Sequence, residues 1–371
     1  MMLDVLFDIV SFLVTVFVRA AIAAIIIFVL AVIFRAIRRF TVDRLQYERH
    51  FVDECVYEGD TTELVETIWN PTPFIVLFAD VESYFYSGLS IENMTIAKGD
   101  MRHFVSRYHL LPFEKITRRI AVECVKRGYY KLTSVSIYRC GDKNHINSHA
   151  EIYVYPKIDE TAARIPGAYG LGDELSRRKL IRNPFSVNGI REYQQGDSFR
   201  DINFKISARL SVGGNPRFAV NRYDYCSNSK YYIYQNFHLQ KESKLIFDDY
   251  EELMELGLRF SASLLVKAIE SGGTCAFSAN CATVRGDRSV IFPMRAGEVH
   301  KRDILREMAL TRAIDGVSFT SILASDLARG IYNSEIFIIT SFIDETMSAQ
   351  IAMFERMGNA VKVIMLGGET E

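Results

Sequence analysis

A polar, arginine-rich block spans residues 189–209 and offers side chains suited to bind a charged ligand. It reads G-I-R-E-Y-Q-Q-G-D-S-F-R-D-I-N-F-K-I-S-A-R. Guanidinium groups donate several hydrogen bonds in one plane and match carboxylates and phosphates. The block therefore predicts a cationic face for an acidic partner or a phosphate, with Glu192 and Asp197 orienting the cations. The side chains of this expected face are Arg191, Arg200, Lys205 and Arg209.

The same block also has a structural interpretation. Gly196 and Asp197 are typical turn residues, and Asp197 is suited to cap the segment that begins at Ser198. The arginines would then form buried ion pairs that join two domains, and such networks commonly imitate functional sites. The residues that serve either partner binding or interdomain contact are Arg191, Glu192, Tyr193, Gly196, Asp197, Arg200, Lys205 and Arg209.

Other candidates for catalysis or metal binding are weaker. His145 and His149 have i,i+4 spacing, but their neighbours suggest a solvated loop, and Asp142 and Glu151 complete no known ligand spacing. An acidic run at the start of a predicted helix complements the helix dipole; it consists of Asp248, Asp249, Glu251, Glu252 and Glu255. The sequence has no phosphate-binding glycine motif and no nucleophile motif. We therefore expect no catalytic residue, no metal and no cofactor.

The six cysteines lie far apart and form no C-x-x-C pair. They predict buried thiols in a reducing compartment rather than disulfides or zinc ligands. A catalytic alternative needs a deep pocket that gathers, for example, Cys226, His238 and a carboxylate. The cysteines are Cys55, Cys124, Cys140, Cys226, Cys275 and Cys281.

Length and charge limit the class of protein. The chain has 371 residues, of which 49% are hydrophobic, so it can form two substantial cores. At roughly 150 residues per domain, two or three units are expected. The 44 basic and 45 acidic residues give a net charge of −1. Because this balance provides no general attraction to phosphate backbones, we expect no nucleic-acid partner.

The N-terminal residues predict a membrane anchor. From Ile9 to Phe34 the only charged residue is Arg19, and a helix of that length exceeds the roughly 30 Å hydrocarbon core of a bilayer. Acidic residues precede the span and arginines follow it, which is unlike a cleavable signal peptide. The positive-inside rule then places the following chain in the cytoplasm, because of Arg35, Arg38, Arg39 and Arg44. We expect a single-pass protein of the cell membrane, in contact with the lipid bilayer, with cytoplasmic soluble domains.

Arg19 leaves two alternatives for this span. A charge near the bilayer centre costs at least about 2.5 kcal/mol and favours a partner, such as a second copy of the chain in a homo-oligomer. Alternatively, Arg19 marks a turn between two short apolar segments, residues 5–18 and 20–34, with the first lying in the interface. Each half is too short to span a bilayer alone.

Periodicity divides the rest of the chain into two regions. From about residue 41 to 157, short β-rich runs separated by turn residues predict a β-sandwich. These runs are residues 52–57, 64–69, 74–78, 118–124, 131–138 and 151–155. After residue 226, strands alternate with amphipathic helices, which predicts a largely parallel sheet covered by helices. The strands are residues 231–234, 274–279, 289–292, 335–340 and 361–366, and the helices are one capped by Asp249, residues 299–313, residues 320–328 and one opened by Asp344.

The polar block carries a family resemblance. Its spacing R-E-Y-x-x-G-D-x-x-R-x-I-x-(aromatic)-K-x-S-A-R resembles domain-of-unknown-function family 58 (DUF 58) of bacteria and archaea. Three weaker landmarks agree, namely Tyr57-Glu58-Gly59-Asp60, Arg127-Gly128-Tyr129-Tyr130 and Val154-Tyr155-Pro156. The resemblance covers about residues 50–370 and implies a von Willebrand factor A-like domain after the block. Where the family has Asp-Trp, this chain has Asn203-Phe204, which puts a catalytic role for that pair in doubt.

The resemblance also identifies a degenerate metal site. Von Willebrand factor A-like domains normally hold a divalent cation with a D-x-S-x-S loop, a Thr and a further Asp. Here Asn236, His238 and Gln240 stand where the Asp and two serines would be, and Ser341-Phe342 replaces Ser-Asp. Without these carboxylates and hydroxyls the site loses most of its charge, so we expect no metal there.

These patterns together predict an α+β multidomain protein. It would comprise a transmembrane helix in residues 1–40, a β-sandwich in 41–160, a signature segment in 161–225, and an α/β Rossmann-like von Willebrand factor A-like domain in 226–371. The resemblance implies an adaptor that works with a MoxR-type AAA+ ATPase in the assembly or maturation of other proteins, without its own catalysis. The alternatives are a hydrolase-like enzyme with a site between the cytoplasmic domains, and a structural envelope protein.

Overall fold

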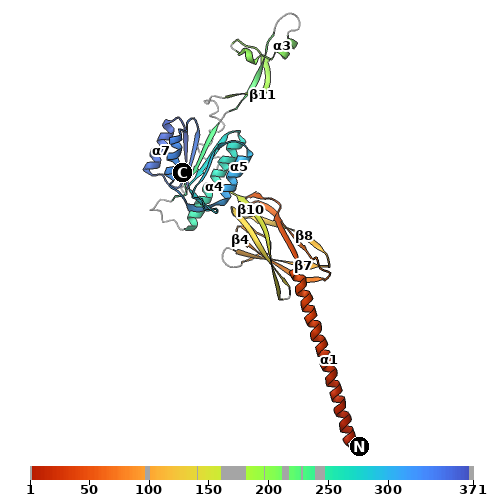
Figure 1. Cartoon of the computed structure of the whole chain (residues 1–371). Coiled ribbons are helices and arrows are strands. Elements are labelled where there is room, and N and C mark those ends of the chain that lie inside the picture. Colours follow the sequence, from red (N-terminus) through yellow and green to blue (C-terminus); the bar gives the residue numbers. More distant parts are fainter. Residues whose placement is uncertain are drawn as a thin grey trace. The chain divides into compact units, whose positions relative to one another are not determined.

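The protein has an N-terminal apolar helix and a mixed α/β body that contains several sheets (Figure 1). The computed structural model describes residues 2–96, 101–139, 141–159, 181–195, 197–210, 217–226, 229–238 and 247–366. The chain divides into two compact units, Met1–Val154 and Tyr155–Glu371. Each unit is described below by itself.

Helix α1 runs without a break from Met2 to Asp43. Because this stretch contains no glycine or proline, no residue interrupts the backbone hydrogen bonds. The alternative of a turn at Arg19 is therefore wrong, and Arg19 lies inside the helix with an exposed side chain. Residues Thr15–Asp43 form an apolar helix of 29 residues. At about 44 Å this helix is long enough to cross a hydrocarbon core of about 30 Å.

The rest of unit 1 is a sandwich of two sheets, with strand orders β1-β3-β8-β5 and β2-β10-β9-β4-β7-β6. Leu64 and Val122 from the first sheet share one buried cluster with Phe85 and Ile152 from the second. Inward residues alternate with solvent-facing ones along the strands, as two packed sheets require. The strands are β1 Gln46–Phe51, β2 Cys55–Tyr57, β3 Thr61–Trp69, β4 Val76–Tyr86, β5 Leu89–Ser90, β6 Thr95–Ile96, β7 Met101–Leu110, β8 Lys115–Cys124, β9 Gly128–Arg139 and β10 Asp142–Tyr155.

The structure confirms the strand-rich prediction and corrects two of its details. Strand β10 pairs antiparallel with β9 from Asp142 onward, so the loop predicted around His145 and His149 is wrong. Both histidines occupy exposed positions of this strand, and Nδ1 of His145 lies 3.0 Å from Oγ of Ser136. Strand β7 was not predicted. In both strands polar side chains face solvent and obscure the apolar alternation.

Unit 2 contains a five-stranded sheet of order β16-β14-β13-β18-β19, in which only β16 is antiparallel. Tyr234 packs with Ile338 and with residues of α6 and α7 on one face. Gln235 points to the other face, where its Nε2 donates to the Met254 carbonyl of α4. The strands are β13 Lys230–Gln235, β14 Thr274–Ala279, β16 Val290–Arg295, β18 Glu335–Thr340 and β19 Ala360–Met365. The helices are α4 Phe247–Glu270, α5 Glu298–Leu310, α6 Phe319–Arg329 and α7 Glu345–Arg356.

Most elements predicted for this region are confirmed, including a helix opened by Asp344. The carboxylate of Asp344 accepts a hydrogen bond from the Met347 N–H at 2.7 Å. Two helix boundaries differ from the prediction. Helix α4 has already begun at Phe247, so Asp249 is not its cap. Helix α5 ends at Leu310 because β17, Thr311–Asp315, follows at once and pairs with β15, Cys281–Thr283.

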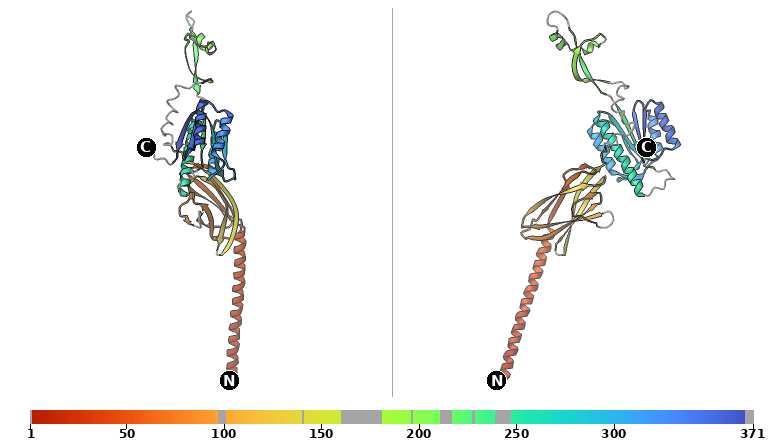
Figure 2. Two further views of the ribbon diagram at one scale, coloured as in Figure 1. Left: turned by 90° about the vertical axis from the view of Figure 1, so that its left-hand side faces the viewer. Right: turned by 180° about the vertical axis from the view of Figure 1, so that it is seen from behind.

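A two-stranded ribbon carries the signature block. Strands β11, Ile181–Glu192, and β12, Ala219–Cys226, pair antiparallel, with Glu192 opposite Ala219. The connection between them includes the 3-10 helix η3, Phe199–Asp201, and helix α3, Phe204–Leu210. Both views in Figure 2 show these short helices at the end of the ribbon.

Candidate functional site

Strand β13 lies in the centre of the five-stranded sheet. Its neighbours are β14 on one side and β18 on the other, so the chain changes direction across the sheet at β13. In open α/β sheets, ligands bind outside the carboxyl ends of the strands at such a switch point. The residues that follow β13, β14 and β18 are therefore the first candidates for a site.

Asn236 follows β13 and forms the centre of a hydrogen-bond network. Its Oδ1 accepts from the His238 N–H at 3.0 Å and from Nδ2 of Asn280 at 3.1 Å. Its Nδ2 donates to Oγ1 of Thr340 at 3.1 Å. The Thr340 hydroxyl donates in turn to the Phe342 carbonyl at 2.7 Å. Asn236, Asn280 and Thr340 are all 0% exposed, so the network is closed to solvent.

The chemistry of this network is neutral. Its members are amide, hydroxyl and backbone groups, and Oδ1 of Asn280 is also engaged, accepting from the Phe237 N–H at 2.7 Å. Within the described residues, no three His, Cys, Asp or Glu side chains are grouped to hold a metal. Of the degenerate metal-site positions, Asn236 is buried, His238 is half-buried and Gln240 lies outside the described residues. Such a network can hold loops together by hydrogen bonds.

Sequence analysis missed Asn280 and Thr340 as members of this network, and Asn280 has the larger structural role. It follows β14 directly, and its carbonyl accepts from the Gly316 N–H at 2.8 Å. A Cβ at Gly316 would collide with the Arg288 carbonyl, so this close approach requires glycine. The sequence offered one signal for Asn280, which is an amide residue directly after an apolar strand. Because the carboxyl ends of parallel strands share one edge of the sheet, such a residue lies near the residues that follow the neighbouring strands.

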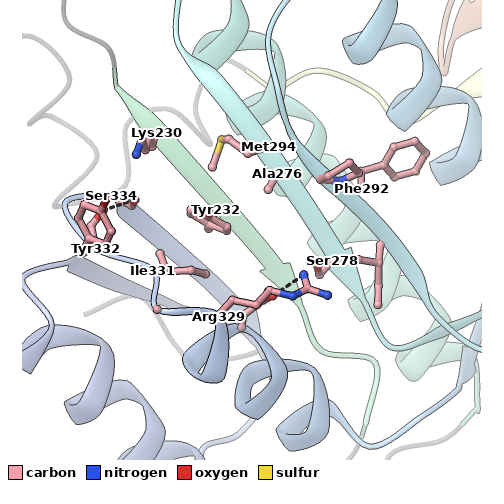
Figure 3. Close-up of a pocket in the computed structure, with 14 residues that line it drawn as sticks. Lys230, Tyr232, Ala276, Ser278, Phe292, Met294, Arg329, Ile331, Tyr332 and Ser334 are labelled. Atoms are coloured by element: carbon pink, nitrogen blue, oxygen red, sulfur yellow. Dashed lines mark hydrogen bonds and ion pairs between the residues drawn. The ribbon is translucent and has the colours of Figure 1, made fainter.

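A cavity of ≈ 380 Å³ lies on one face of the same sheet (Figure 3). Tyr232 of β13 and Ala276 of β14 line it, together with Tyr332 from the segment after α6. Nζ of Lys230 lies 5.4 Å from the centre of the Tyr332 ring. Figure 3 shows Lys230 and Arg329 on opposite sides of Tyr232. The lining thus mixes aromatic and aliphatic side chains with polar groups, which include the cations Lys230 and Arg329 and the carboxylate of Asp326.

The ionisable groups around this cavity are engaged with one another. Asp326 accepts from the Tyr234 hydroxyl at 2.8 Å and from Nη1 of Arg329 at 2.9 Å. Burial, and then the charge of Asp326, raises the pKa of both Tyr232 and Tyr234. Since both phenols stay neutral near pH 7, these groups offer hydrogen bonds and apolar contact rather than acid–base chemistry.

Arg191 and Asp197 of the signature block form a two-point ion pair. Nη1 and Nη2 of Arg191 donate to the two Asp197 oxygens at 2.7 and 2.6 Å. Asp197 also accepts from the Gln194 N–H, and hydrogen bonds from Arg191 and Gln194 lower its pKa. The Arg191 side chain is 42% exposed, so a buried ion pair is wrong here. Asp197 holds the turn before Ser198, and Ser198 itself stands at the start of η3.

Asn203 holds helix α3 against the ribbon. Its Oδ1 accepts from the Ile206 N–H at 3.2 Å, which caps the helix, and its Nδ2 donates to Oδ1 of Asn221 at 2.9 Å. Oγ of Ser207 accepts from the Ala219 N–H at 2.9 Å. The position where the resemblance expects Asp-Trp therefore holds a structural residue, Asn203, followed by an exposed phenylalanine.

The other signature residues do not gather into one site. Glu192 lies 3.9 Å from Arg217, and Tyr193 packs beside two phenylalanines. Gly196 lies outside the described residues. Three cations are exposed and have no hydrogen bond or ion pair with the rest of the described chain; these are Arg200, Lys205 and Arg209.

The described thiols are poor nucleophiles where burial is complete. Burial, with Asp60 and Glu123 nearby, raises the pKa of Cys124 to about 12, and burial also raises the pKa of Cys275. Thiols in such surroundings stay protonated and inert. Cys55 is a free thiol as well. The side chain of Cys226, and Cys140 altogether, lie outside the described residues.

Unit 1 contains a buried polar cluster that the sequence did not indicate. Glu66 is 0% exposed and accepts from the hydroxyls of Tyr47 at 2.6 Å and Tyr108 at 2.9 Å. Arg49 lies opposite Glu66 in the β1–β3 pair and donates to the Ser134 carbonyl at 3.1 Å. Burial first, and then Glu66, raises the pKa of both tyrosines. Because solvent does not reach Glu66, this cluster connects strands rather than binding a ligand.

Comparisons with known proteins give one relative and several weak structural similarities. The sequence matches no family model. It is 21% identical over 331 residues to YeaD, an uncharacterised protein of Bacillus subtilis (strain 168), covering 86% of this chain and 75% of YeaD. The CARDB domain of PF1109 from Pyrococcus furiosus gives a TM-score of 0.24 at 12% identity, covering 31% of this chain and 94% of that domain. A cohesin module from Clostridium perfringens gives 0.23 at 12% identity, covering 31% of this chain and 97% of the module. TM-scores this low identify no shared fold.

Proposed function

We propose that this chain is a membrane-anchored adaptor that works with a MoxR-type AAA+ ATPase in the assembly or maturation of other proteins, without catalysis of its own. The observation that carries the proposal is the closed, neutral network around Asn236. At the edge where α/β sheets normally bind ligands, the amide groups are engaged within the protein. Recognition then falls to exposed surfaces, and the choice of ATPase follows from the family resemblance.

We further propose that residues 226–371 form a von Willebrand factor A-like domain. The support is the strand order, with the first strand of the region, β13, in the centre and an antiparallel strand, β16, at one edge. Asn236, where the resemblance placed the metal loop, meets Thr340 at the carboxyl ends of β13 and β18, and Thr340 directly precedes the Ser341-Phe342 position of the resemblance.

The membrane arrangement belongs to the same proposal. Helix α1 crosses the cell membrane once, and the sandwich of unit 1 and the whole of unit 2 lie in the cytoplasm. The support is the long apolar stretch Thr15–Asp43 and the cluster of arginines that ends it. Arg38 in this cluster donates to Asp142 at 2.6 Å, which ties the end of the helix to the sandwich.

Arg19 supports self-association within the membrane. With the turn excluded, its charge lies inside a helix whose apolar stretch is unburied. A guanidinium at membrane depth costs at least about 2.5 kcal/mol unless it pairs or reaches the interface. A second copy of α1, or another membrane helix, would supply the missing polar contacts.

Chemical crosslinking in native membranes, followed by affinity purification of the full chain, tests the adaptor role. We expect recovery of an AAA+ ATPase with the native chain and with Arg302→Ala, which removes an exposed cation from α5. Arg200→Ala removes an exposed cation from the signature block and should reduce recovery. Recovery of envelope proteins alone, or of nothing, overturns the adaptor role and favours a structural one.

A further inference from the structure

The end of the β11–β12 ribbon exposes apolar side chains beside cations. We call this surface the aromatic–cation tip, and it consists of Phe199, Arg200, Phe204, Lys205, Arg209, Leu210, Arg217 and Phe218. Each apolar residue is next to a cation in the sequence. The exposed fraction is 75% for Phe199, 69% for Phe204 and 44% for Phe218. These side chains belong to the short helices and strand end at one end of the ribbon, and contiguous exposed apolar surface typically marks an interaction site.

The tip is held in shape by the contacts beneath it. The ring of Tyr193 lies 6.2 Å from that of Phe199 and 6.4 Å from that of Phe218, measured between centroids. The Tyr193 N–H donates to the Phe218 carbonyl at 2.8 Å, which extends the strand pairing into the tip. Asn203 caps the helix that carries Phe204. Side chains positioned in advance lose less conformational entropy when a partner binds.

Pairing within the ribbon reduces the number of available cations. Arg191 is committed to Asp197, and Arg217 lies near Glu192. Arg200, Lys205 and Arg209 remain for a partner, while Asp201 lies beside Arg200. The tip is therefore mainly aromatic, with a modest positive charge around its apolar residues.

We propose that the aromatic–cation tip docks into an acidic protein surface that has an apolar pocket for Phe199 and Phe204. Buried aromatic anchors surrounded by charge-assisted contacts are the usual centre of a protein interface. Anionic lipid fits less well, because electrostatic membrane binding relies on clusters of about four to eight basic residues. Nucleic acid fits less well because the chain has a net charge of −1. This inference rests on the proposed adaptor function and locates its recognition surface.

Site-specific photocrosslinking in native membranes tests the docking. A benzophenone amino acid at Ser198, an exposed position beside Phe199, leaves the tip side chains intact in the full chain. We expect one major protein adduct, and a yield at least about tenfold lower when Phe199→Ala and Phe204→Ala are combined. Phe113→Ala is the matched control, because Phe113 is 65% exposed and lies in unit 1. It should leave the yield unchanged.

Charge reversal identifies the chemistry of the partner. Arg200→Glu with Lys205→Glu should lower the adduct yield, and Arg302→Glu on α5 should not. Replacing acidic residues of the crosslinked protein by lysine at the mapped contact should restore the adduct with the reversed tip. Protection of the Cys275 thiol from labelling verifies that each variant retains the fold of unit 2, because Cys275 is 0% exposed.

Several results of these experiments overturn the docking proposal. These are adducts with lipid only, adducts with a second copy of the chain or with the chain's own residues, a yield that is unaffected by loss of the phenylalanines, and a charge-reversed tip that partner lysines do not rescue. Vesicles with anionic lipid and a single-stranded oligonucleotide serve as probes, and tip-dependent binding of either also overturns it.

If the AAA+ ATPase is recovered equally well without the phenylalanines, the adaptor role stands and the docking surface is wrong. If a tip-dependent acidic partner is found and no AAA+ ATPase is recovered with the chain, the docking surface stands and the adaptor role is wrong.

Discussion

Replacing Asn236 with aspartate tests whether the edge of the sheet is a closed neutral network. The substitution preserves the size of the side chain and the oxygen that accepts from His238 and Asn280. It removes the Nδ2 that donates to Thr340 and introduces a carboxyl at a position that is 0% exposed. Asn236→Ala is the companion variant, because it removes all three hydrogen bonds without adding charge.

The expected magnitudes follow from the number of groups left unpaired. Asn236→Ala deprives the buried Nδ2 of Asn280 and the half-buried N–H of His238 of their acceptor. At about 1–3 kcal/mol for the buried donor and at most that for the other, unit 2 should lose about 1–6 kcal/mol at every pH. In Asn236→Asp, burial among neutral groups raises the pKa of the new carboxyl above its unfolded value of about 3.9. A raised folded pKa means that stability is fully present below pH 4 and is lost as pH rises. Unit 2 should therefore lose about 1.4 kcal/mol per pH unit above pH 4 until the folded pKa is reached.

The two units need separate probes of unfolding. Trp69 is the single tryptophan and lies in β3, so its fluorescence follows unit 1. Cys275 is fully buried in β14, so urea titration with pulsed thiol labelling, read by mass spectrometry, follows unit 2. The urea concentration at which half of the protein is unfolded, followed at Cys275, should be lower for both variants than for the native chain. The same midpoint followed at Trp69 should stay at its native value.

Two outcomes contradict the reasoning. Equal stability of Asn236→Asp at pH 4 and pH 7 would mean that the new carboxylate is not held in a neutral, desolvated environment. Recovery of stability at pH 7 on addition of Mg²⁺, and not of an equal concentration of K⁺, would mean that the edge is a cation site lacking one carboxylate. The same titration of Asn236→Ala separates loss of hydrogen bonds from introduction of charge.

Three further predictions use the same probes. Tyr47 and Tyr108 have pKa values raised by burial and Glu66, so the stability of unit 1 is present below pH 10 and falls above it, by about 1.4 kcal/mol per pH unit for each tyrosine. Tyr108→Phe should halve this loss of unfolding free energy per pH unit, measured by urea titrations followed at Trp69. An unchanged loss would exclude Tyr108 as its source. Asp344→Ala should cost unit 2 about 1 kcal/mol at Cys275 by removing the cap of α7, whereas Asp303→Ala, at an exposed site within α5, should cost little. Gly316→Ala should cost about 1–3 kcal/mol by overpacking against the Arg288 carbonyl, and Gly189→Ala, which meets open space, is its control; equal effects of the two would contradict the close approach.

The elements that the sequence predicted well have uninterrupted apolar patterns. Strand β14 spans residues 274–279 as expected, because its apolar run follows two glycines and ends at Asn280. The first half of β10 was missed because its outward residues are polar and its neighbour β9 supplies the pairing. Pairing between strands is a property of the fold, so the composition of one segment did not indicate it.

The candidate sites were also predicted only in part, because their residue types can be read from one segment but their contacts cannot. Asn236 and His238 were identified from their places in the resemblance, but the bonds that close the network come from Asn280 and Thr340, which are distant in sequence. The arginines of the signature block were identified by type. Their different roles depend on contacts, since Arg191 is paired and Arg200 is exposed.

The fold gives a physical reason for recognition to lie on the ribbon rather than on the sheet. At the sheet edge, opening the network around Asn236 for a ligand would leave buried donors unpaired, so binding there carries a cost of several kcal/mol. At the aromatic–cation tip, Phe199 and Phe204 are already exposed, so covering them with a partner releases unfavourable contact with water. These costs favour the ribbon end over the switch point as the proposed recognition surface. A partner that recognises Phe199 and Phe204 needs no rearrangement of the sheet.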